Sequence, residues 1–186
     1  MKRMSAISIL FVLSAGCAPS RTLPSFDTVV RGTSGVHTTS AEATTRLSQL
    51  KLRRLVGGVE DPTHFESKVV VVDVWASWCD PCKESLPEAQ SFAAELQDKP
   101  FELVTINVDE QDAPVQKFLA MNGLDTLASR VLRDPGGDFV RRTMRVADTP
   151  TTLIFDAAGR LRFTHRGASA EITKRVRSEV LSLLRD

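Results

Sequence analysis

Two cysteines separated by two residues are the most reactive combination in this sequence of 186 residues, where Cys79 and Cys82 enclose Asp-Pro. Such a pair can cycle between dithiol and disulfide, supply two ligands of a zinc site, or form a structural crosslink. Zinc is disfavoured because there is no second Cys-x-x-Cys and the three His are scattered. The crosslink is disfavoured because closing so short a loop removes little entropy from the unfolded chain. Thiol–disulfide exchange is therefore the expected chemistry, with no metal and no cofactor.

A buried strand that runs directly into a helix is predicted to hold this pair. Residues 69–75 form a continuous run that is mostly valine, which is typical of a strand buried on both faces. After Cys82 the apolar residues recur at spacings of three and four, as in an amphipathic helix. Pro81 suits the first turn of that helix, and Pro87 predicts a kink within it.

Cys79 is expected at the N-terminus of this helix. Unpaired N–H groups and the helix dipole stabilise a thiolate there, which lowers the pKa of a cysteine from about 8.5 toward about 3.5–7.5. The predicted reaction has two steps. The Cys79 thiolate attacks a disulfide of the partner, and Cys82, one turn deeper on the same helix face, then attacks Cys79 and releases the reduced partner.

Two further side chains near the pair are candidates for a role. Asp73 lies within the buried run and could accept the proton of Cys82, provided that desolvation raises its pKa. An exposed acid on an edge strand is the alternative for Asp73, and the apolar neighbours on both sides disfavour it. Trp78, beside the reactive thiol, is a candidate for partner docking, although Trp75 and Trp78 are equally consistent with packing roles.

The remaining patterns predict an α/β fold, a central mixed sheet flanked by helices on both faces. The expected elements are a strand over 101–108, a helix over 114–121 ending at Gly123, a strand remnant and a short helix within 131–148, strands over 151–155 and 160–164, and a closing amphipathic helix from residue 172. Upstream of the first strand, residues 47–56 are expected to add a helix against this core.

The chain begins with the pattern of a secretory signal peptide over residues 1–16. A basic start precedes the apolar run 6–13, which is about half of the roughly 20 residues that span a bilayer. Residues 13–17, Leu-Ser-Ala-Gly-Cys, resemble the lipobox of bacterial lipoproteins, in which the cysteine becomes the lipidated first residue. Ser14 departs from that pattern, in which a large aliphatic residue usually lies three positions before the cysteine. An ordinary signal peptide that leaves Cys17 without a role is the alternative.

Residues 17–45 are rich in Ser and Thr and poor in aliphatic and aromatic side chains. Such a segment cannot bury enough apolar surface to order itself, so a flexible tether is expected before a single domain over 46–186. Lipid at Cys17 would be the chain's only membrane contact. In lipoproteins generally, Ala18 rather than Asp favours the outer membrane, if the source has two membranes.

Composition narrows the possible partners. The net charge is +1, with 42% hydrophobic and 25% charged residues, as in an ordinary globular protein. No global electrostatic field therefore attracts nucleic acid, which is not an expected partner. The domain is expected to act as a monomer.

Residues 72–83, Val-Asp-Val-Trp-Ala-Ser-Trp-Cys-Asp-Pro-Cys-Lys, resemble the active-site segment of thioredoxins. Together with Thr-Pro-Thr-Thr at 149–152 and Asp-Ala-Ala-Gly at 156–159, they resemble the exported, membrane-tethered TlpA-like and ResA-like thiol–disulfide oxidoreductases. The resemblance extends from about residue 69 to the C-terminus. It implies a thioredoxin fold and a place in the bacterial cell envelope.

The same resemblance implies a cis peptide bond between Thr149 and Pro150, beside the disulfide. There the proline excludes metal ions, and the adjoining backbone pairs with a substrate strand. Two positions depart from the tethered reductases. Ser85 stands where they carry Glu, three residues after the second Cys, and Asp73 is the acid of thioredoxins where the tethered group often has Asn. The acid–base group is therefore expected to be that of thioredoxins, and no substrate is inferred from cytochrome maturation.

Three functions remain open on the sequence. The first is a disulfide reductase that acts on exported proteins carrying disulfides and receives electrons from a membrane thiol donor. The second is an oxidase or isomerase that uses the same cysteines. Asp80, next to Cys79, disfavours the thiolate and so favours the reductase. The third is a binding module without catalysis, which the joint presence of both cysteines, Asp73 and Pro150 disfavours.

Overall fold

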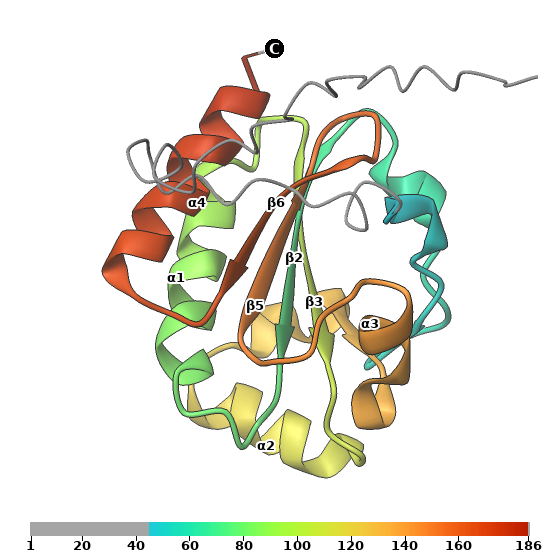
Figure 1. Ribbon diagram of the computed structural model, residues 1–186. Coiled ribbons are helices and arrows are strands. Elements are labelled where there is room, and N and C mark those ends of the chain that lie inside the picture. Colours follow the sequence, from blue (N-terminus) through green and yellow to red (C-terminus); the bar gives the residue numbers. More distant parts are fainter. Residues whose placement is uncertain (1–44, 186) are drawn as a thin grey trace, which may run out of the picture. The chain divides into compact units, whose positions relative to one another are not determined.

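The computed structural model describes residues 45–185, which form one mixed sheet with helices on both faces (Figure 1). The strands are β1 (Arg53–Arg54), β2 (Val69–Trp75), β3 (Phe101–Asn107), β4 (Val131–Arg133), β5 (Thr151–Phe155) and β6 (Leu161–Arg166). The α-helices are α1 (Cys82–Glu95), α2 (Asp112–Met121), α3 (Asp138–Arg142) and α4 (Ala170–Leu183), and shorter 3-10 turns connect them. The strand order is β1-β4-β3-β2-β5-β6, which confirms the predicted fold class.

The central strand is β2, and every one of its residues is buried. It pairs in parallel with β3 and antiparallel with β5. Because successive side chains of a strand point to opposite faces, its valines contribute alternately to the two layers of the core. Val71 belongs to one hydrophobic cluster, and Val70 and Val72 belong to the other. The unbroken apolar run of this segment is therefore explained by burial on both faces.

The two clusters are covered by different helices. Phe92 of α1, Phe118 of α2 and Val180 of α4 pack on the first face of the sheet. Val140 of α3 and Phe65 of the 3-10 turn Pro62–Phe65 pack on the second face. Full burial of such a side chain contributes about 1.5–3 kcal/mol to folding, so both layers hold the sheet in place.

The prediction of a helix over residues 47–56 is wrong. Residues Leu47–Gln49 form one 3-10 turn, and the chain then extends into β1, which pairs antiparallel with β4 at the edge of the sheet. The spacing of three between Leu47 and Leu50 needs only that single turn to bury both side chains. The backbone of β1 gains its hydrogen bonds from β4, a partner that local periodicity cannot reveal.

The predicted signal peptide 1–16, Cys17 and all of the predicted tether except its last residue lie outside the described residues. That last residue, Thr45, is buried, and its hydroxyl donates a hydrogen bond to the carbonyl oxygen of Thr143 at 3.5 Å. Between residues 45 and 185, no helix has the length and apolar character needed to cross a bilayer.

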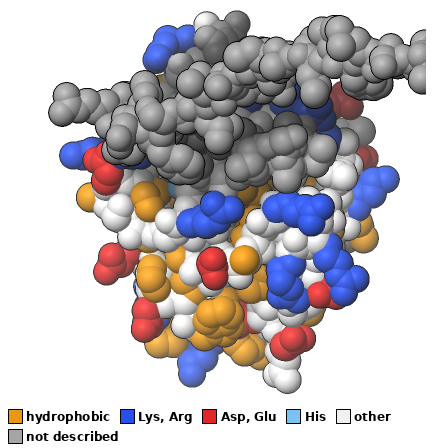
Figure 2. Space-filling model, viewed as in Figure 1, with side chains coloured by type: hydrophobic (Ala, Val, Ile, Leu, Met, Phe, Trp, Pro, Cys, Tyr) orange, Lys and Arg blue, Asp and Glu red, His pale blue; other side chains and the backbone are white. Residues whose placement is uncertain are grey.

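The parallel pairing of β2 and β3 decides where the site lies. Trp75 at the carboxyl end of β2 is paired in register with Asn107 at the carboxyl end of β3. The loops that follow both strands therefore emerge at the same edge of the sheet. On the face seen in Figure 2, hydrophobic side chains gather toward the end of the molecule where these loops emerge, at the bottom of the view, among scattered charged groups.

Candidate active site

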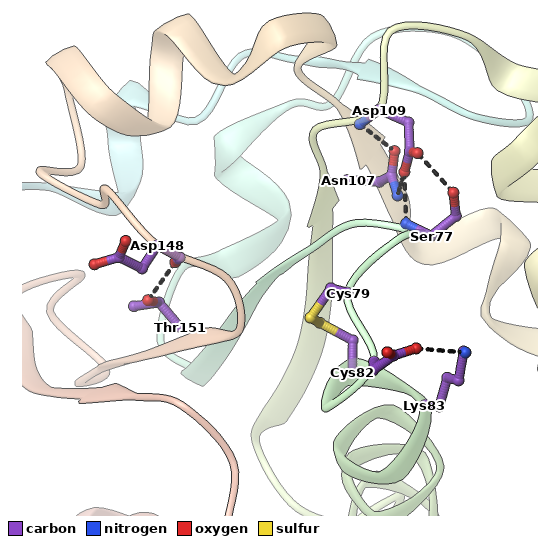
Figure 3. Close-up of a disulfide and its surroundings, with 9 residues drawn as sticks. Ser77, Cys79, Cys82, Lys83, Asn107, Asp109, Asp148 and Thr151 are labelled. Carbon is purple, nitrogen blue, oxygen red and sulfur yellow. Dashed lines mark hydrogen bonds and ion pairs between the residues drawn. A yellow bond between two sulfur atoms is a disulfide. The ribbon is translucent and has the colours of Figure 1, made fainter.

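Cys79 and Cys82 form a disulfide at the start of α1 (Figure 3). The helix begins at Cys82, and Cys79 lies in the turn that leads into it, where the Cys82 N–H donates to the Cys79 carbonyl oxygen at 3.1 Å. Cys79 is 4% exposed and Cys82 is 0% exposed. Only Cys79 therefore presents any surface that a partner could reach.

The residues between the cysteines set the local charge. Pro81 caps the helix with φ −63° and ψ −21°, a helical conformation in which its missing N–H leaves no bond unmade. Lys83 Nζ donates to Asp80 Oδ1 at 2.6 Å, and this hydrogen bond and the Lys83 charge hold the pKa of Asp80 below its ordinary value. Because Lys83 offsets the charge of Asp80, the field of this acid at Cys79 is weaker than the sequence alone suggests.

Asp73 lies in the middle of the sheet, directly opposite Thr152 of β5. Burial raises the pKa of Asp73 to about 6, while a hydrogen bond of 2.6 Å from the Thr152 hydroxyl acts in the opposite direction. Asp73 shares a cavity of about 50 Å³ with Ser85 and Glu88 of α1. Ser85 is one helical turn beyond Cys82 on the same side of α1, so the carboxyl lies beneath the first turns of the active-site helix.

The two tryptophans near the pair have different environments. Trp75 is 1% exposed and packs against Phe118, with 5.0 Å between the ring centroids. Trp78 is 69% exposed. Trp75 is therefore a packing residue, whereas Trp78 presents its ring to anything that approaches Cys79.

A hollow of about 460 Å³ lies beside Trp78 and is also lined by Thr149. The peptide bond between Thr149 and Pro150 is cis, as expected. The floor and rim of the hollow differ in chemistry. Apolar side chains come from Val74, Val108, Val140 and Val146, and charged ones come from Glu110, Arg141 and Asp148. The hollow is thus suited to an extended segment with one apolar side chain and polar neighbours.

One part of the site was not identified from the sequence. Ser77, in the loop before Cys79, donates two hydrogen bonds to the carboxylate of Asp109 just beyond β3. The side chain of Asn107 donates a hydrogen bond to the same carboxylate (Figure 3). A usable signal existed, since Asn107 and Asp109 are polar residues at the end of a predicted buried strand. Their contact with Ser77 follows only once β3 is known to run parallel to β2.

Within residues 45–185, no group of three or more His, Cys, Asp and Glu side chains is placed to hold a metal ion. His64 and His165 each pair with a single glutamate instead, Glu60 and Glu179 respectively.

Known proteins share both the sequence pattern and the fold. The chain is 31% identical to the thiol-disulfide oxidoreductase ResA of Oceanobacillus iheyensis over 104 residues, which is 56% of this chain and 52% of that protein. It is 26% identical to the thioredoxin-like protein YneN of Bacillus subtilis over 132 residues, 71% of this chain and 74% of that protein. The chain thus spans about half the length of the first of these relatives.

A solved structure agrees with the architecture described above. A Chlorobium tepidum protein assigned as the thiol:disulfide interchange protein DsbE superposes with a TM-score of 0.66 and 29% sequence identity, over 72% of this chain and 92% of that one. The model of the Redoxin family matches residues 38–181, which include the sheet, the cysteine pair and the cis proline. With the thioredoxin fold and the Cys-x-x-Cys pair at its active-site edge, this chain belongs to the Redoxin family.

Proposed function

We propose that the chain is an exported thiol–disulfide oxidoreductase that acts as a disulfide reductase through Cys79 and Cys82. The observation that carries this proposal is the position of the pair. Cys79 keeps a small exposed surface and directly follows the exposed Trp78, which lines the hollow, Cys82 is fully buried, and a carboxyl with a raised pKa lies beneath the helix. The similarity to proteins named thiol-disulfide oxidoreductase supports the same chemistry.

The proposed reaction transfers two electrons to the partner. The Cys79 thiolate attacks one sulfur of the partner's disulfide, so that a mixed disulfide forms and the other partner sulfur leaves as a thiolate. Cys82 loses its proton to Asp73 and attacks the Cys79 sulfur, which releases the second partner thiolate. The partner is reduced, and the Cys79–Cys82 pair is oxidised to the disulfide. A membrane thiol donor would restore the dithiol by the same exchange in reverse.

The proposed partners are exported proteins that carry disulfides. Trp78, Thr149 and Pro150 would dock the segment around the partner's disulfide, because Trp78 and Thr149 line the hollow and Pro150 follows Thr149 through the cis peptide bond. The small floor of valine side chains would accept an aliphatic residue of that segment. The domain would act as a monomer.

We infer the direction of electron flow from the acids near the pair. Stabilised thiolates make a dithiol a strong oxidant, and negative charge near the sulfurs has the opposite effect. Asp73 beneath α1 supplies such a charge when it is ionised, and Asp80 adds a weaker one because Lys83 offsets it. A reductase is therefore favoured over an oxidase or isomerase.

The reduction potential of the Cys79–Cys82 couple tests this direction. We expect a value closer to the roughly −270 mV of thioredoxin than to the roughly −120 mV of the oxidant DsbA. The purified chain should also reduce insulin disulfides when dithiothreitol supplies electrons. A potential near that of DsbA, with faster oxidation of reduced ribonuclease than reduction of insulin, would reverse the proposed direction.

Attachment to the bacterial envelope through lipid on Cys17 is part of the proposal. A Cys17→Ser chain should move from the membrane fraction to the soluble exported fraction, because a mature chain without lipid lacks the apolar anchor. The measurement is fractionation of cells that express each form, with metabolic labelling by a fatty acid analogue. If the Cys17→Ser chain stays in the same membrane fraction, the anchor is not at Cys17.

A further inference from the structure

A hydrogen-bonded network from the neighbouring strand holds the loop that carries Cys79 (Figure 3). Asp109, just beyond the end of β3, accepts two hydrogen bonds from Ser77, one from the backbone N–H at 2.8 Å and one from the hydroxyl at 2.6 Å. Asp109 is 5% exposed, and Ser77 is two residues before Cys79. We propose that Asp109 is a positioning residue for Cys79, which by fixing Ser77 keeps the thiol at the N-terminus of α1.

Asn107 holds the Asp109 carboxylate in this orientation. Its side-chain Nδ2 donates to Asp109 Oδ2 at 2.7 Å, and its Oδ1 accepts from the Asp109 N–H at 3.0 Å and from the Arg133 guanidinium. With its oxygen occupied by two donors, the amide can present only its NH₂ group to the carboxylate. Asp109 therefore has three donors around its side chain and no freedom to turn away from Ser77.

Arg133 extends the network to the edge of the sheet. Its side chain is 0% exposed and donates to the carbonyl oxygens of Asn107 at 3.1 Å and Asp109 at 2.9 Å. Its Nε donates to Asp112 at 2.8 Å, and Arg53 of β1 binds the same carboxylate through two hydrogen bonds of 3.0 and 2.8 Å. The short N-terminal strand β1 is thereby connected to the Cys79 loop through four polar side chains.

Such a network is not explained by stability alone. Burying a charged group is costly, and replacing buried ion pairs by apolar side chains of similar volume is often neutral or stabilising. What this network supplies is fixed geometry at the place where the loop to Cys79 leaves β2. The stabilisation of a thiolate by a helix N-terminus falls off within the first turn, so a small displacement of Cys79 changes its pKa.

A role of Asp109 through its charge and a role through its hydrogen bonds predict opposite changes in the pKa of Cys79 when Asp109 is replaced. A carboxylate near a thiol raises the thiol pKa by like-charge repulsion, so removing the charge lowers it. Removing the positioning bonds has the opposite effect, because Cys79 leaves the helix N-terminus. Asp109→Asn removes the charge but keeps an oxygen for the Ser77 N–H, and the Ser77 hydroxyl can rotate to accept from the new NH₂ group. Asp109→Ala removes both charge and bonds.

The test is the pH dependence of alkylation of Cys79 by iodoacetamide, in the full-length chain with Cys17→Ser and Cys82→Ser so that Cys79 is the single thiol. Charged groups on the surrounding elements stay unchanged in every variant, among them Asp73, Asp80, Lys83, Glu84, Glu110, Arg133, Arg141 and Asp148. A matched control is Asp156→Ala. Asp156 is 6% exposed and also accepts several hydrogen bonds, but it lies after β5, at the opposite end of the sheet from Cys79.

We expect Asp109→Ala to raise the apparent pKa of Cys79 and to slow its alkylation at pH 7 by about three- to tenfold. Asp109→Asn should leave the rate within about twofold of the parent or increase it, and Asp156→Ala should leave it unchanged. Ser77→Ala loses only the hydrogen bond of the hydroxyl, and it should slow alkylation less than Asp109→Ala does. If Asp109→Ala fails to fold, the alkylation rate of Ser77→Ala tests the inference instead.

Two results would overturn the inference. If Asp109→Ala and Asp109→Asn both accelerate alkylation, Asp109 acts only through its charge. If Asp156→Ala slows alkylation as much as Asp109→Ala, the effect is general loss of structure. The inference rests on the proposed function for the identity of the reactive thiol. Alkylation needs no protein partner, however, so it can succeed even where insulin reduction and the reduction potential contradict the proposed direction.

Discussion

Cys79→Ser is expected to abolish thiol–disulfide exchange, and Cys82→Ser is expected to trap the partner as a mixed disulfide. The reason is the unequal placement of the two sulfurs at the start of α1. Cys79 retains exposed surface in the loop, whereas Cys82 has none and is the first residue of the helix. A partner sulfur can therefore reach only Cys79, and only Cys82 is placed to resolve the bond that forms.

The measurement combines turnover of insulin with capture of partners. Loss of insulin reduction by at least about a thousandfold is expected for Cys79→Ser, because a serine hydroxyl is not ionised at neutral pH and cannot replace the thiolate. In a Cys17→Ser background, non-reducing gels should show covalent adducts for Cys82→Ser that dithiothreitol removes, and none when Cys79→Ser is added. Equal alkylation rates of both thiols in the reduced wild-type chain at pH 7 would contradict this assignment, as would adducts formed through Cys82 in Cys79→Ser.

The elements around the cysteine pair were predictable because local signals agreed with tertiary structure. The valine-rich run of β2 can be buried only at the centre of a sheet, and the apolar spacing after Cys82 matches the buried face of α1. The segment 47–56 behaved differently. Three of its four leucines are buried, but the conformation of β1 within it is decided by pairing with β4, whose residues lie far along the chain. Pairing at a sheet edge has no local signature.

The candidate site shows the same division. Cys79, Cys82 and Pro150 were found from their spacing and a family resemblance, and the burial of Asp73 followed from its neighbours. The buried Arg133 could not be foreseen, since arginine is rarely fully buried and nothing in its local sequence marks it. Its role depends on groups supplied by β1, β3 and α2, which meet only after the sheet has formed.

Asp73→Asn is expected to stabilise the fold and to slow exchange. The pKa of Asp73 rises from 3.8 to about 6 on folding because burial disfavours its charged form. A group whose pKa is higher in the folded state destabilises the protein as pH rises through that range. The penalty is absent below about pH 4, grows up to about pH 6 and is complete above it, where it amounts to about 3 kcal/mol. Asn keeps the size and the acceptor for Thr152 but removes the charge.

Urea unfolding of the oxidised chain between pH 4 and pH 8 measures the first effect. Asp73→Asn should match the wild type near pH 4 and exceed it by up to about 3 kcal/mol at pH 8. Asp156→Asn is the control with the opposite sign. Burial alone raises the pKa of Asp156, but hydrogen bonds from Arg160 and Arg162 outweigh it and keep that pKa below the ordinary value. Asp156→Asn should therefore lose stability at neutral pH.

The kinetic effect of Asp73→Asn separates a proton acceptor from a merely buried acid. Release of the mixed disulfide requires Cys82 to lose its proton. Asp73 shares a cavity large enough to admit water with Ser85, which is one helical turn beyond Cys82. Without this acceptor, release should slow by at least about tenfold near pH 7, and the slowing should shrink at higher pH as hydroxide takes over. Glu88 and Arg177 border the same cavity and stay unchanged. An Asp73→Asn chain that is more stable but releases its partner at the wild-type rate at every pH would show that Asp73 takes no part in proton transfer. Ser85→Glu, which places an acid on α1, would then be the variant expected to change the rate.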